Sequence, residues 1–184
     1  MINNGWLQQH ACPVYIEHIA SPHYDQRETN DISLLVIHNI SLPPGEFGGD
    51  YISDLFLGRL DPNAHPYFED IYQLRVSAHC LIRRDGAIIQ YVPFNKRAWH
   101  AGVSQFDGRD KCNDFSIGIE LEGSDDVPYT EAQYQTLKWL TKAIKSEYPG
   151  ITKQRVTGHC HIAPGRKTDP GESFDWQRYL SSFD

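Results

Sequence analysis

The sequence predicts an α/β fold in a single domain, with a central mixed β-sheet flanked by helices. Short apolar runs that alternate with helical segments along the chain indicate this class. The chain has 184 residues, of which 40% are apolar and 22% are charged, so it is long enough to bury a core. No internal repeat, low-complexity tract or linker interrupts it, and we expect residues 1–184 to form one domain.

Charge and composition exclude several kinds of partner. The formal net charge of −7 argues against nucleic acid, and an anionic small molecule would bind only at a local cationic cluster. No apolar run is long enough to span a membrane, and residues 1–10 lack the pattern of a secretory signal. The four cysteines form no CxxC pair. We therefore expect reduced thiols, a cytoplasmic location, and neither a membrane nor an obligate protein partner.

The first strong patterns lie between residues 33 and 58. Residues 33–40 form an apolar run typical of a buried strand, with His38 near its end. Residues 41–49 are too rich in proline and glycine for a helix or a central strand, so they predict a loop beside His38. Residues 50–57 then fit a short helix that Gly58 ends.

The middle of the chain contains a hairpin pattern. Residues 77–82 and 87–92 are strand-like, and they flank Asp85-Gly86, a dipeptide typical of tight hairpin turns. His79 falls within the first of these strands. We expect it to be a hydrogen-bonded histidine of the core.

Residues 93–114 have few regular patterns but many residue types that occur at ligand sites. Trp99 and His100 stand together, and Lys111 follows further along. Aromatic and cationic side chains on a long loop suit the rim of a ligand site. A solvated loop anchored by one tryptophan explains the same residues equally well.

Residues 115–123 alternate apolar residues with small or polar ones, which is the period of a half-buried strand. Gly118 and Glu120 share the polar face. The glycine leaves room above the sheet, and Glu120 would project into that room beside the strand that carries His38. Glu120 is therefore a catalytic candidate. The apolar face comprises Phe115, Ile117, Ile119 and Leu121, and the other face also includes Ser116 and Glu122.

The clearest helix begins after Thr130. Thr130 and Gln133 have the spacing of a capping box, and apolar residues recur at helical spacing until Pro149 ends the pattern. We predict that this helix packs against the core and takes no part in the chemistry. Residues 155–157 then fit a short strand, and residues 173–183 fit an amphipathic helix.

Residues 158–171 hold two imidazoles, a thiol, a lysine and a carboxylate in a run rich in glycine and proline. We expect this run to be a loop rather than a helix. Such a loop can direct His159 and Asp169 to one point while Lys167 approaches from the side. Together with His38, they make a sensible ligand set for a catalytic Zn²⁺ ion that keeps one position open for water. We predict a zinc amidase.

In combination, these motifs resemble the cytoplasmic 1,6-anhydro-N-acetylmuramoyl-L-alanine amidases of the AmpD type. The resemblance covers essentially the whole chain. The resemblance is specific because the motifs occur together. Any one motif alone would not identify the family. The matching segments are residues 34–49, 74–82, 97–103, 112–123 and 167–171.

The resemblance implies the fold of the phage-lysozyme-type amidases and the peptidoglycan recognition proteins. The implied substrate is the anhydromuramoyl peptide released during wall turnover, cut between its lactyl group and L-alanine in peptidoglycan recycling. The resemblance also implies a role for each site residue. Zinc is held by His38, His159 and Asp169, catalysis uses Glu120 and Lys167, and substrate is bound by Asn39 and Arg75, to which we add Trp99, His100 and Lys111 at the rim.

The chain departs from the family at two positions. Lys111 stands where the family carries arginine, so a substrate carboxylate would be gripped less directionally. His161 adds an imidazole close to His159 that could compete for the metal. Two alternatives remain open: a peptidoglycan-binding module of this fold without catalysis, and a structural zinc protein with Cys160 as a ligand, whose closed site would lack the position for water.

Overall fold

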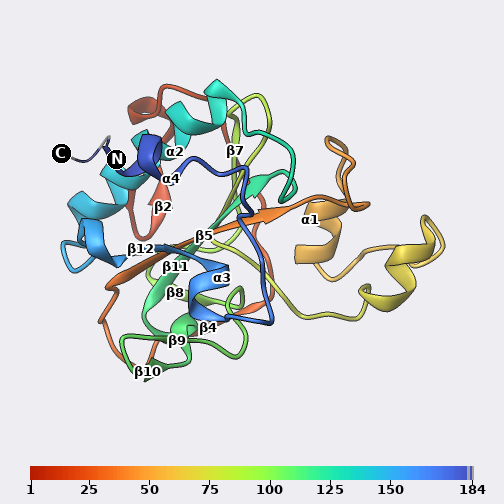
Figure 1. The fold of residues 1–184 in the computed structure, drawn as a ribbon, viewed down its shortest axis with the longest axis horizontal. Helices are drawn as coiled ribbons and strands as arrows, with labels where there is room; N and C mark the ends of the chain where they lie inside the picture. Colours follow the sequence, from red (N-terminus) through yellow and green to blue (C-terminus); the bar gives the residue numbers. More distant parts are fainter. Residues whose placement is uncertain (182, 184) are drawn as a thin grey trace.

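The computed structural model describes residues 1–181 and 183. Its centre is a six-stranded sheet with the strand order β12-β5-β11-β6-β7-β3 (Figure 1). The first four strands in this order run parallel, β7 is antiparallel to β6, and β3 is parallel to β7. The predicted mixed sheet is therefore confirmed. The strands are β3 (Ile16–His18), β5 (Leu34–Ile40), β6 (Cys80–Ile82), β7 (Ile88–Gln90), β11 (Ser116–Glu122) and β12 (Val156–Gly158).

The other elements are short, except for one long helix. Three two-stranded ribbons are β1 (Ile2–Asn3) with β2 (Trp6–Leu7), β4 (Tyr24–Gln26) with β8 (Lys96–Ala98), and β9 (Gln105–Phe106) with β10 (Arg109–Asp110). The α-helices are α1 (Tyr51–Phe56), α2 (Glu131–Glu147), α3 (His159–Ile162) and α4 (Trp176–Ser181). Single 3₁₀ turns are η1 (Gln9–Ala11), η2 (Pro66–Asp70), η3 (Cys112–Asp114) and η4 (Lys153–Arg155).

One face of the sheet is covered by α2 and α4. The predicted capping box starts α2: Gln133 N–H donates to Thr130 Oγ1, and Thr130 N–H donates to the Gln133 side chain, each at 3.1 Å. The apolar side of α2 packs on the apolar residues of β5 and β11. The helix therefore has the packing role that was predicted for it. The shared cluster includes Leu35, Ile37, Ile117, Ile119, Leu121, Leu137, Leu140, Ile144 and Tyr179.

The opposite face of the sheet carries the polar groups. Alternate residues of β5 and β11 point there, and the segment from Trp99 to Phe115 covers them together with α3. Phe115 itself was predicted to share a face with Ile117, but it precedes β11 and packs on this opposite face instead. The small apolar cluster on this side consists of Leu34, Val36, Ala101, Cys112, Phe115 and Ile162.

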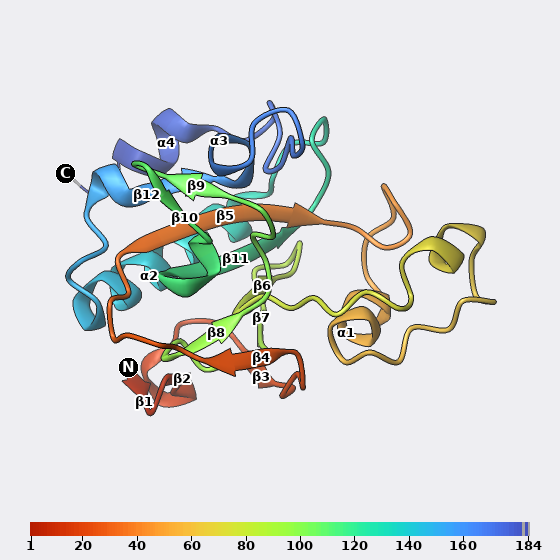
Figure 2. The ribbon, with the colours of Figure 1, turned by 90° about the horizontal axis from the view of Figure 1, so that it is seen from below.

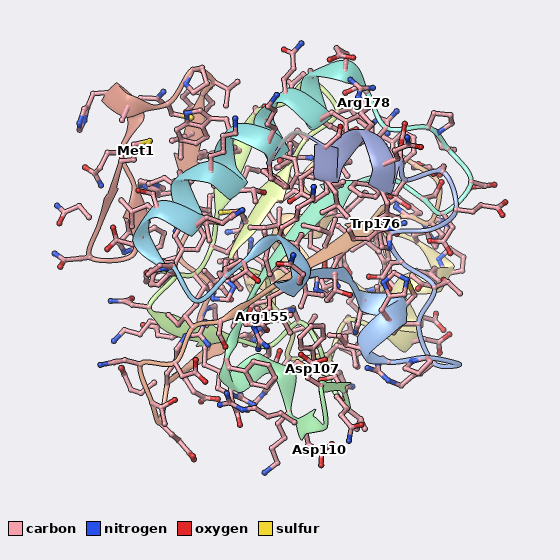
Figure 3. The ribbon with its side chains drawn as sticks, turned by 60° about the vertical axis from the view of Figure 1, so that its left-hand side comes forward. Met1, Asp107, Asp110, Arg155, Trp176 and Arg178 are labelled. Atoms are coloured by element: carbon pink, nitrogen blue, oxygen red, sulfur yellow. The ribbon has the colours of Figure 1, made fainter. Side chains whose placement is uncertain are left out.

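Arg155 holds the β9–β10 ribbon against the sheet, as Figure 3 shows beside the labelled Asp107. Its guanidinium donates to the backbone oxygen of Ser33 at 2.5 Å and forms an ion pair with Asp107 at 3.4 Å. The same group stacks over the ring of Phe106, 5.0 Å from its centroid. The start of β12 and the ribbon that covers the polar face are therefore tied together.

Helix α1 and the segment that follows it project from one end of the sheet, as the orange and yellow parts of Figures 1 and 2 show. The predicted helix of residues 50–57 is confirmed, and Gly58 ends it with a φ of 69°. Its own apolar cluster includes Leu55, Phe56, Leu60, Phe68 and Tyr91. This projection forms a wall of the cavity described below.

The structure corrects the prediction that residues 158–171 form only a loop, because His159–Ile162 makes one turn of helix. Ala163 N–H donates to the oxygen of His159 at 3.0 Å and closes the turn. Cys160 N–H donates to the oxygen of Asp169 at 2.9 Å, which draws the remainder of the segment back onto the turn. These contacts stabilise a helical turn in a segment whose glycine and proline content favours a loop.

Three boundaries also differ from the predictions. His79 lies one residue before β6, although it is fully buried and hydrogen-bonded as predicted. Residues 93–114 contain three short strands, which are too brief to show a period in the sequence. The closing helix is confined to Trp176–Ser181, and Ser182 of its predicted range lies outside the described residues.

Two predictions from composition also bear on the structure. All four cysteines are unpaired. Within the described residues, no helix combines the length and the apolar character needed to cross a membrane.

Candidate active site

Strand pairing brings His38 and Glu120 together. The strands β5 and β11 are parallel, with Glu120 directly opposite His38 in the register. Both side chains point to the polar face of the sheet, as the alternation of residues 115–123 predicted for Glu120. His38 is 1% exposed and Glu120 is 8% exposed, so both side chains are largely shielded from solvent.

Three potential ligand atoms converge beside this pair. Nδ1 of His38, Nδ1 of His159 and Oδ2 of Asp169 each lie 3.0 Å from the other two. Among the described residues, these three form the group whose ligand atoms could hold one ion. Cys160 and His161 are not members of the group, although the sequence left both open as competitors.

Hydrogen bonds on the far side of each imidazole hold its ring in place. Nε2 of His159 lies 3.1 Å from the carbonyl oxygen of Ala101, so that nitrogen must carry the proton, and Nδ1 keeps its lone pair. Nε2 of His38 lies 2.9 Å from Nδ1 of His100, whose own Nε2 lies 3.2 Å from Oγ of Ser116. If His38 donates to His100 and His100 donates to Ser116, both His38 and His159 direct lone pairs at the same point.

The charge state of the group fits zinc. Burial lowers the pKa of His38 to about 4, although its contact with Asp169 opposes the shift, so the imidazole is neutral at pH 7. Burial alone would raise the pKa of Asp169, but the two histidine contacts outweigh it and hold the pKa below its usual range. Two histidines and one carboxylate are a ligand set that catalytic zinc uses, with a fourth position left for water.

A cavity of about 340 Å³ opens over this group. Glu120, Lys167 and Trp99 line it, and the projection that carries α1 supplies an apolar wall. Its polar floor and apolar side would suit a ligand with both amide and hydrocarbon parts. The apolar part of the lining includes Leu42, Leu55, Phe56, Tyr67, Ile71, Leu74 and Val76.

A larger cavity, of about 550 Å³, lies at the hairpin turn and does not contain this chemistry. The Glu122 carboxylate there accepts from Gly48 N–H at 2.7 Å and from Arg84 N–H at 3.0 Å, and it pairs with Arg83 at 3.3 Å. Glu122 and Arg83 are thus paired with each other and bonded to the loop of residues 41–49. Size alone therefore does not locate the active site.

Glu120 is poised as a proton acceptor. Its Oε2 is buried, and no hydrogen-bond partner lies within reach among the described residues. Burial raises the pKa of Glu120 well above its ordinary value, the charge of Asp169 raises it further, and the charge of Lys167 opposes the shift. A buried, unpaired carboxyl oxygen beside these potential metal ligands is suited to exchange protons with a reacting group.

This environment predicts a pH-dependent stability for the metal-free protein. Because the folded pKa of Glu120 lies above its unfolded value, the stability that this group contributes is present at low pH and is lost as the pH rises through the folded pKa. Glu120→Gln mimics the protonated form. It should raise the Tm of chelator-treated protein at pH 7 and change it little near pH 4, as measured by circular dichroism. A Tm that is unchanged at pH 7 would contradict the burial argument.

The other predicted residues occupy different positions. Lys167 is exposed but lines the cavity, and Trp99 lines it with its Nε1–H donated to Asp25 at 2.7 Å. Asn39 also lines it, but its amide nitrogen donates to Asp125 at 2.9 Å and to the oxygen of Pro170 at 3.0 Å. Its carbonyl oxygen thus remains for any contact with substrate.

Arg75 and Lys111 are exposed and are not part of the cavity lining. Arg75 stands between Leu74 and Val76, both of which line the cavity. Lys111 has left-handed backbone geometry, with a φ of 59°, and precedes η3. Their binding roles stay predictions.

His100 lines the cavity, but both of its ring nitrogens contact groups of the protein. Its ring fills the space above Gly118, where an added Cβ would lie 2.4 Å from the His100 ring. The room predicted from Gly118 therefore exists, but it holds His100. The roles of Ala101 and Ser116 were missed, because a backbone carbonyl and a strand serine give no signal in a sequence.

The comparisons with known proteins agree with this geometry. A family model described as N-acetylmuramoyl-L-alanine amidase matches residues 28–172. The 1,6-anhydro-N-acetylmuramyl-L-alanine amidase AmpD of Haemophilus influenzae is 66% identical over 165 residues, covering 89% of this chain and 90% of that protein. The AmpD of Escherichia coli K12 is 61% identical over 180 residues, covering 97% and 94% of the two chains.

Solved structures give the same assignment. The crystal structure of a selenomethionine AmpD derivative superposes with a TM-score of 0.94 at 60% identity, covering 100% of this chain and 99% of that chain. The amidase AmiD of E. coli, solved with its substrate anhydro-N-acetylmuramic acid-L-Ala-D-γ-Glu-L-Lys, has a TM-score of 0.62 at 31% identity, covering 96% and 60% of the two chains. The chain is therefore an amide hydrolase that belongs to the N-acetylmuramoyl-L-alanine amidase family, and within that family to the AmpD type.

Proposed function

We propose that this protein is a zinc-dependent amidase that cuts the amide between the lactyl group of 1,6-anhydro-N-acetylmuramic acid and L-alanine. The observation that carries this proposal is the convergence of His38, His159 and Asp169 beside Glu120 in one cavity. The names of its relatives support the substrate, because proteins up to 66% identical act on 1,6-anhydro-N-acetylmuramyl-L-alanine.

Zinc held by the three ligands would supply Lewis acidity, which activates water and polarises the amide carbonyl. The residues of the chain orient the ligands, move the proton and stabilise the developing charge. His38 and His159 keep their Nδ1 lone pairs directed at the ion, because their other ring nitrogens are engaged by His100 and Ala101. Asp169 adds one negative charge and limits the net charge of the site to about +1.

Glu120 moves the proton. Its free Oε2 accepts a proton from the attacking water and delivers it to the nitrogen of the departing L-alanine. The raised pKa of the Glu120 carboxyl lets this side chain hold the proton near neutral pH between the two transfers. Lys167 lines the same cavity, and its fixed charge stabilises the oxyanion, an effect typically on the order of 3 kcal/mol for one donor.

The cavity divides the substrate between two surfaces. The polar floor faces the amide, and the apolar wall from the α1 projection accepts the anhydro sugar with Trp99. The bound ligands of two structural neighbours support this class of substrate. AmiD was solved with an anhydromuramoyl tripeptide, and AmpDh3 of Pseudomonas aeruginosa, which is 27% identical with a TM-score of 0.62, was solved with anhydromuramic pentapeptide.

The cellular role follows from the substrate. An anhydromuramoyl peptide is a fragment released by wall turnover, so its cleavage serves peptidoglycan recycling. We place the reaction in the cytoplasm, which suits a protein with four unpaired thiols. We assign residues 1–184 to one amidase domain, since the family model spans residues 28–172.

Mass spectrometry of the products tests the proposal directly. Purified anhydromuramoyl tripeptide should be converted to the anhydro sugar acid and free tripeptide. A chelator should stop the conversion, and added zinc should restore it. Intact substrate after incubation with zinc-loaded protein would favour the non-catalytic binding module instead.

Arg75 provides a separate prediction about substrate binding. It is exposed beside two residues that line the cavity, where it can reach a carboxylate of the stem peptide. Arg75→Ala should raise KM, lower kcat/KM about ten- to a hundredfold and leave zinc content unchanged, because a charge-assisted bond contributes about 1.5–3 kcal/mol. Lys111→Arg should match or exceed wild type, because the guanidinium fork suits a carboxylate.

The control for Arg75 is a shorter substrate. Anhydromuramoyl-L-alanine lacks the distal carboxylates, so Arg75→Ala should hardly change its hydrolysis. If Arg75→Ala slows the hydrolysis of both substrates equally, Arg75 supports the fold or the metal site, and the binding role should be abandoned.

A further inference from the structure

Both candidate imidazole ligands are supported by one dipeptide. The side chain of His100 contacts Nε2 of His38 at 2.9 Å, and the backbone oxygen of the next residue, Ala101, accepts from Nε2 of His159 at 3.1 Å. His38 lies in strand β5, whereas His159 begins the helical turn α3. The orientation of both rings therefore depends on where the backbone of residues 100 and 101 lies.

One buried side chain fixes that backbone. Oδ1 of Asn113 accepts from the N–H of His100 at 3.1 Å and from the N–H of Ala101 at 2.8 Å. Asn113 is 7% exposed and belongs to η3, and its own backbone oxygen accepts from Arg27 at 3.1 Å. Arg27 is itself half-buried and also donates to the backbone oxygens of Phe94, Asp114 and Ser116.

We infer that Asn113 is a positioning residue that orients both histidine ligands through the His100–Ala101 peptide. Without its Oδ1, two N–H groups in a buried segment lose their acceptor, and the peptide has to move to find another. The movement withdraws His100 from His38 and the Ala101 oxygen from His159. The sequence left residues 93–114 open between a ligand rim and a solvated loop, whereas this inference gives them a role in holding the proposed zinc ligands.

The inference rests on the zinc site of the proposed function, so it needs a measurement without metal as well. In metal-free protein labelled with ¹⁵N-histidine, wild type should show one well-defined set of ring-nitrogen signals for His38 and one for His159, because Asp169 and the His100–Ala101 peptide hold each ring from its two sides. Asn113→Ala should give more than one set at both histidines. Ser116→Ala, which removes the partner of His100 Nε2 but not the Ala101 oxygen, should alter His38 and spare His159.

Zinc affinity gives the second measurement, by competition between full-length protein and a chromophoric chelator. Asn113→Ala should weaken zinc binding about ten- to a hundredfold, the usual effect of removing a group that orients a ligand. Asn113→Asp keeps an acceptor oxygen and should restore most of the affinity. The matched control is Ser104→Ala, which removes a side-chain bond to Cys112 N–H in the same loop but does not touch residues 100 and 101.

Each outcome decides the inference. More than one set of ring-nitrogen signals and weaker zinc binding in Asn113→Ala, with Ser104→Ala close to wild type, support it. Wild-type ring-nitrogen signals in Asn113→Ala, or an equal loss of zinc in Ser104→Ala, overturn it and leave general loosening of the loop as the cause. Wild-type protein that binds no zinc would refute the proposed function, whereas the ring-nitrogen signals of the metal-free protein would still test the role of Asn113.

Discussion

Replacement of Asp169 by alanine is expected to remove zinc and to abolish amide hydrolysis. Three ligand atoms at mutual distances of 3.0 Å surround one point, and two of them cannot hold the ion in competition with water. His38→Ala and His159→Ala should behave in the same way. Metal content measured by mass spectrometry, together with product formation from anhydromuramoyl tripeptide, checks both expectations.

The fold should survive this change in Asp169, which separates loss of metal from loss of structure. Asp169 is partly exposed, and its backbone oxygen still accepts from Cys160 N–H in the variant. Far-UV circular dichroism should therefore match wild type. Full zinc occupancy and activity in Asp169→Ala would refute the ligand assignment and return Cys160 and His161 to consideration.

Glu120→Gln should retain zinc and substrate while turnover falls about a hundredfold or more. The amide keeps the shape of the side chain but cannot accept the proton of the attacking water. The loss should appear in kcat, with zinc content and substrate affinity close to wild type, because Glu120 is not one of the converging ligands. Isothermal titration with substrate and single-turnover kinetics would distinguish these quantities.

A matched control for Glu120 is available in the same strand. Glu122 lies two residues further along β11 on the same face, but its carboxylate bonds Gly48 and Arg84 at the other cavity. Glu122→Gln should therefore leave the chemical step nearly intact. If Glu120→Gln turns over at the wild-type rate, the carboxylate is only part of the cavity wall and another base must be sought.

The elements that were predicted well are those with local signals. The helix after Thr130 has a capping box and a long period, and strands β5 and β11 have enough residues to show apolar runs or alternation. Their parallel pairing, however, joins residues about eighty positions apart, which no local pattern contains. The sequence analysis placed Glu120 beside the strand of His38 as a hypothesis, and the register that sets the two residues opposite each other came only from the structure.

The features that were missed depend on tertiary contacts. The turn α3 forms although glycine and proline flank it, because Asp169 and Cys160 bond across the segment. The contact of His100 with His38 was missed because it spans 62 positions of the sequence, and the binding role predicted for His100 stays a prediction. A backbone carbonyl such as that of Ala101 is common to every residue type, so its bond to His159 leaves no trace in the sequence.

The order of strands has a consequence for biosynthesis. Strand β5 is made early, yet both of its neighbours, β11 and β12, leave the ribosome much later. An apolar strand with two open edges must therefore be protected for most of translation, which is a hazard for aggregation. A chain arrested before residue 156 lacks β12, His159 and Asp169 together. The converging group of His38, His159 and Asp169 is therefore complete only after the segment that follows β12 has been made, and a chain arrested earlier lacks the proposed metal site.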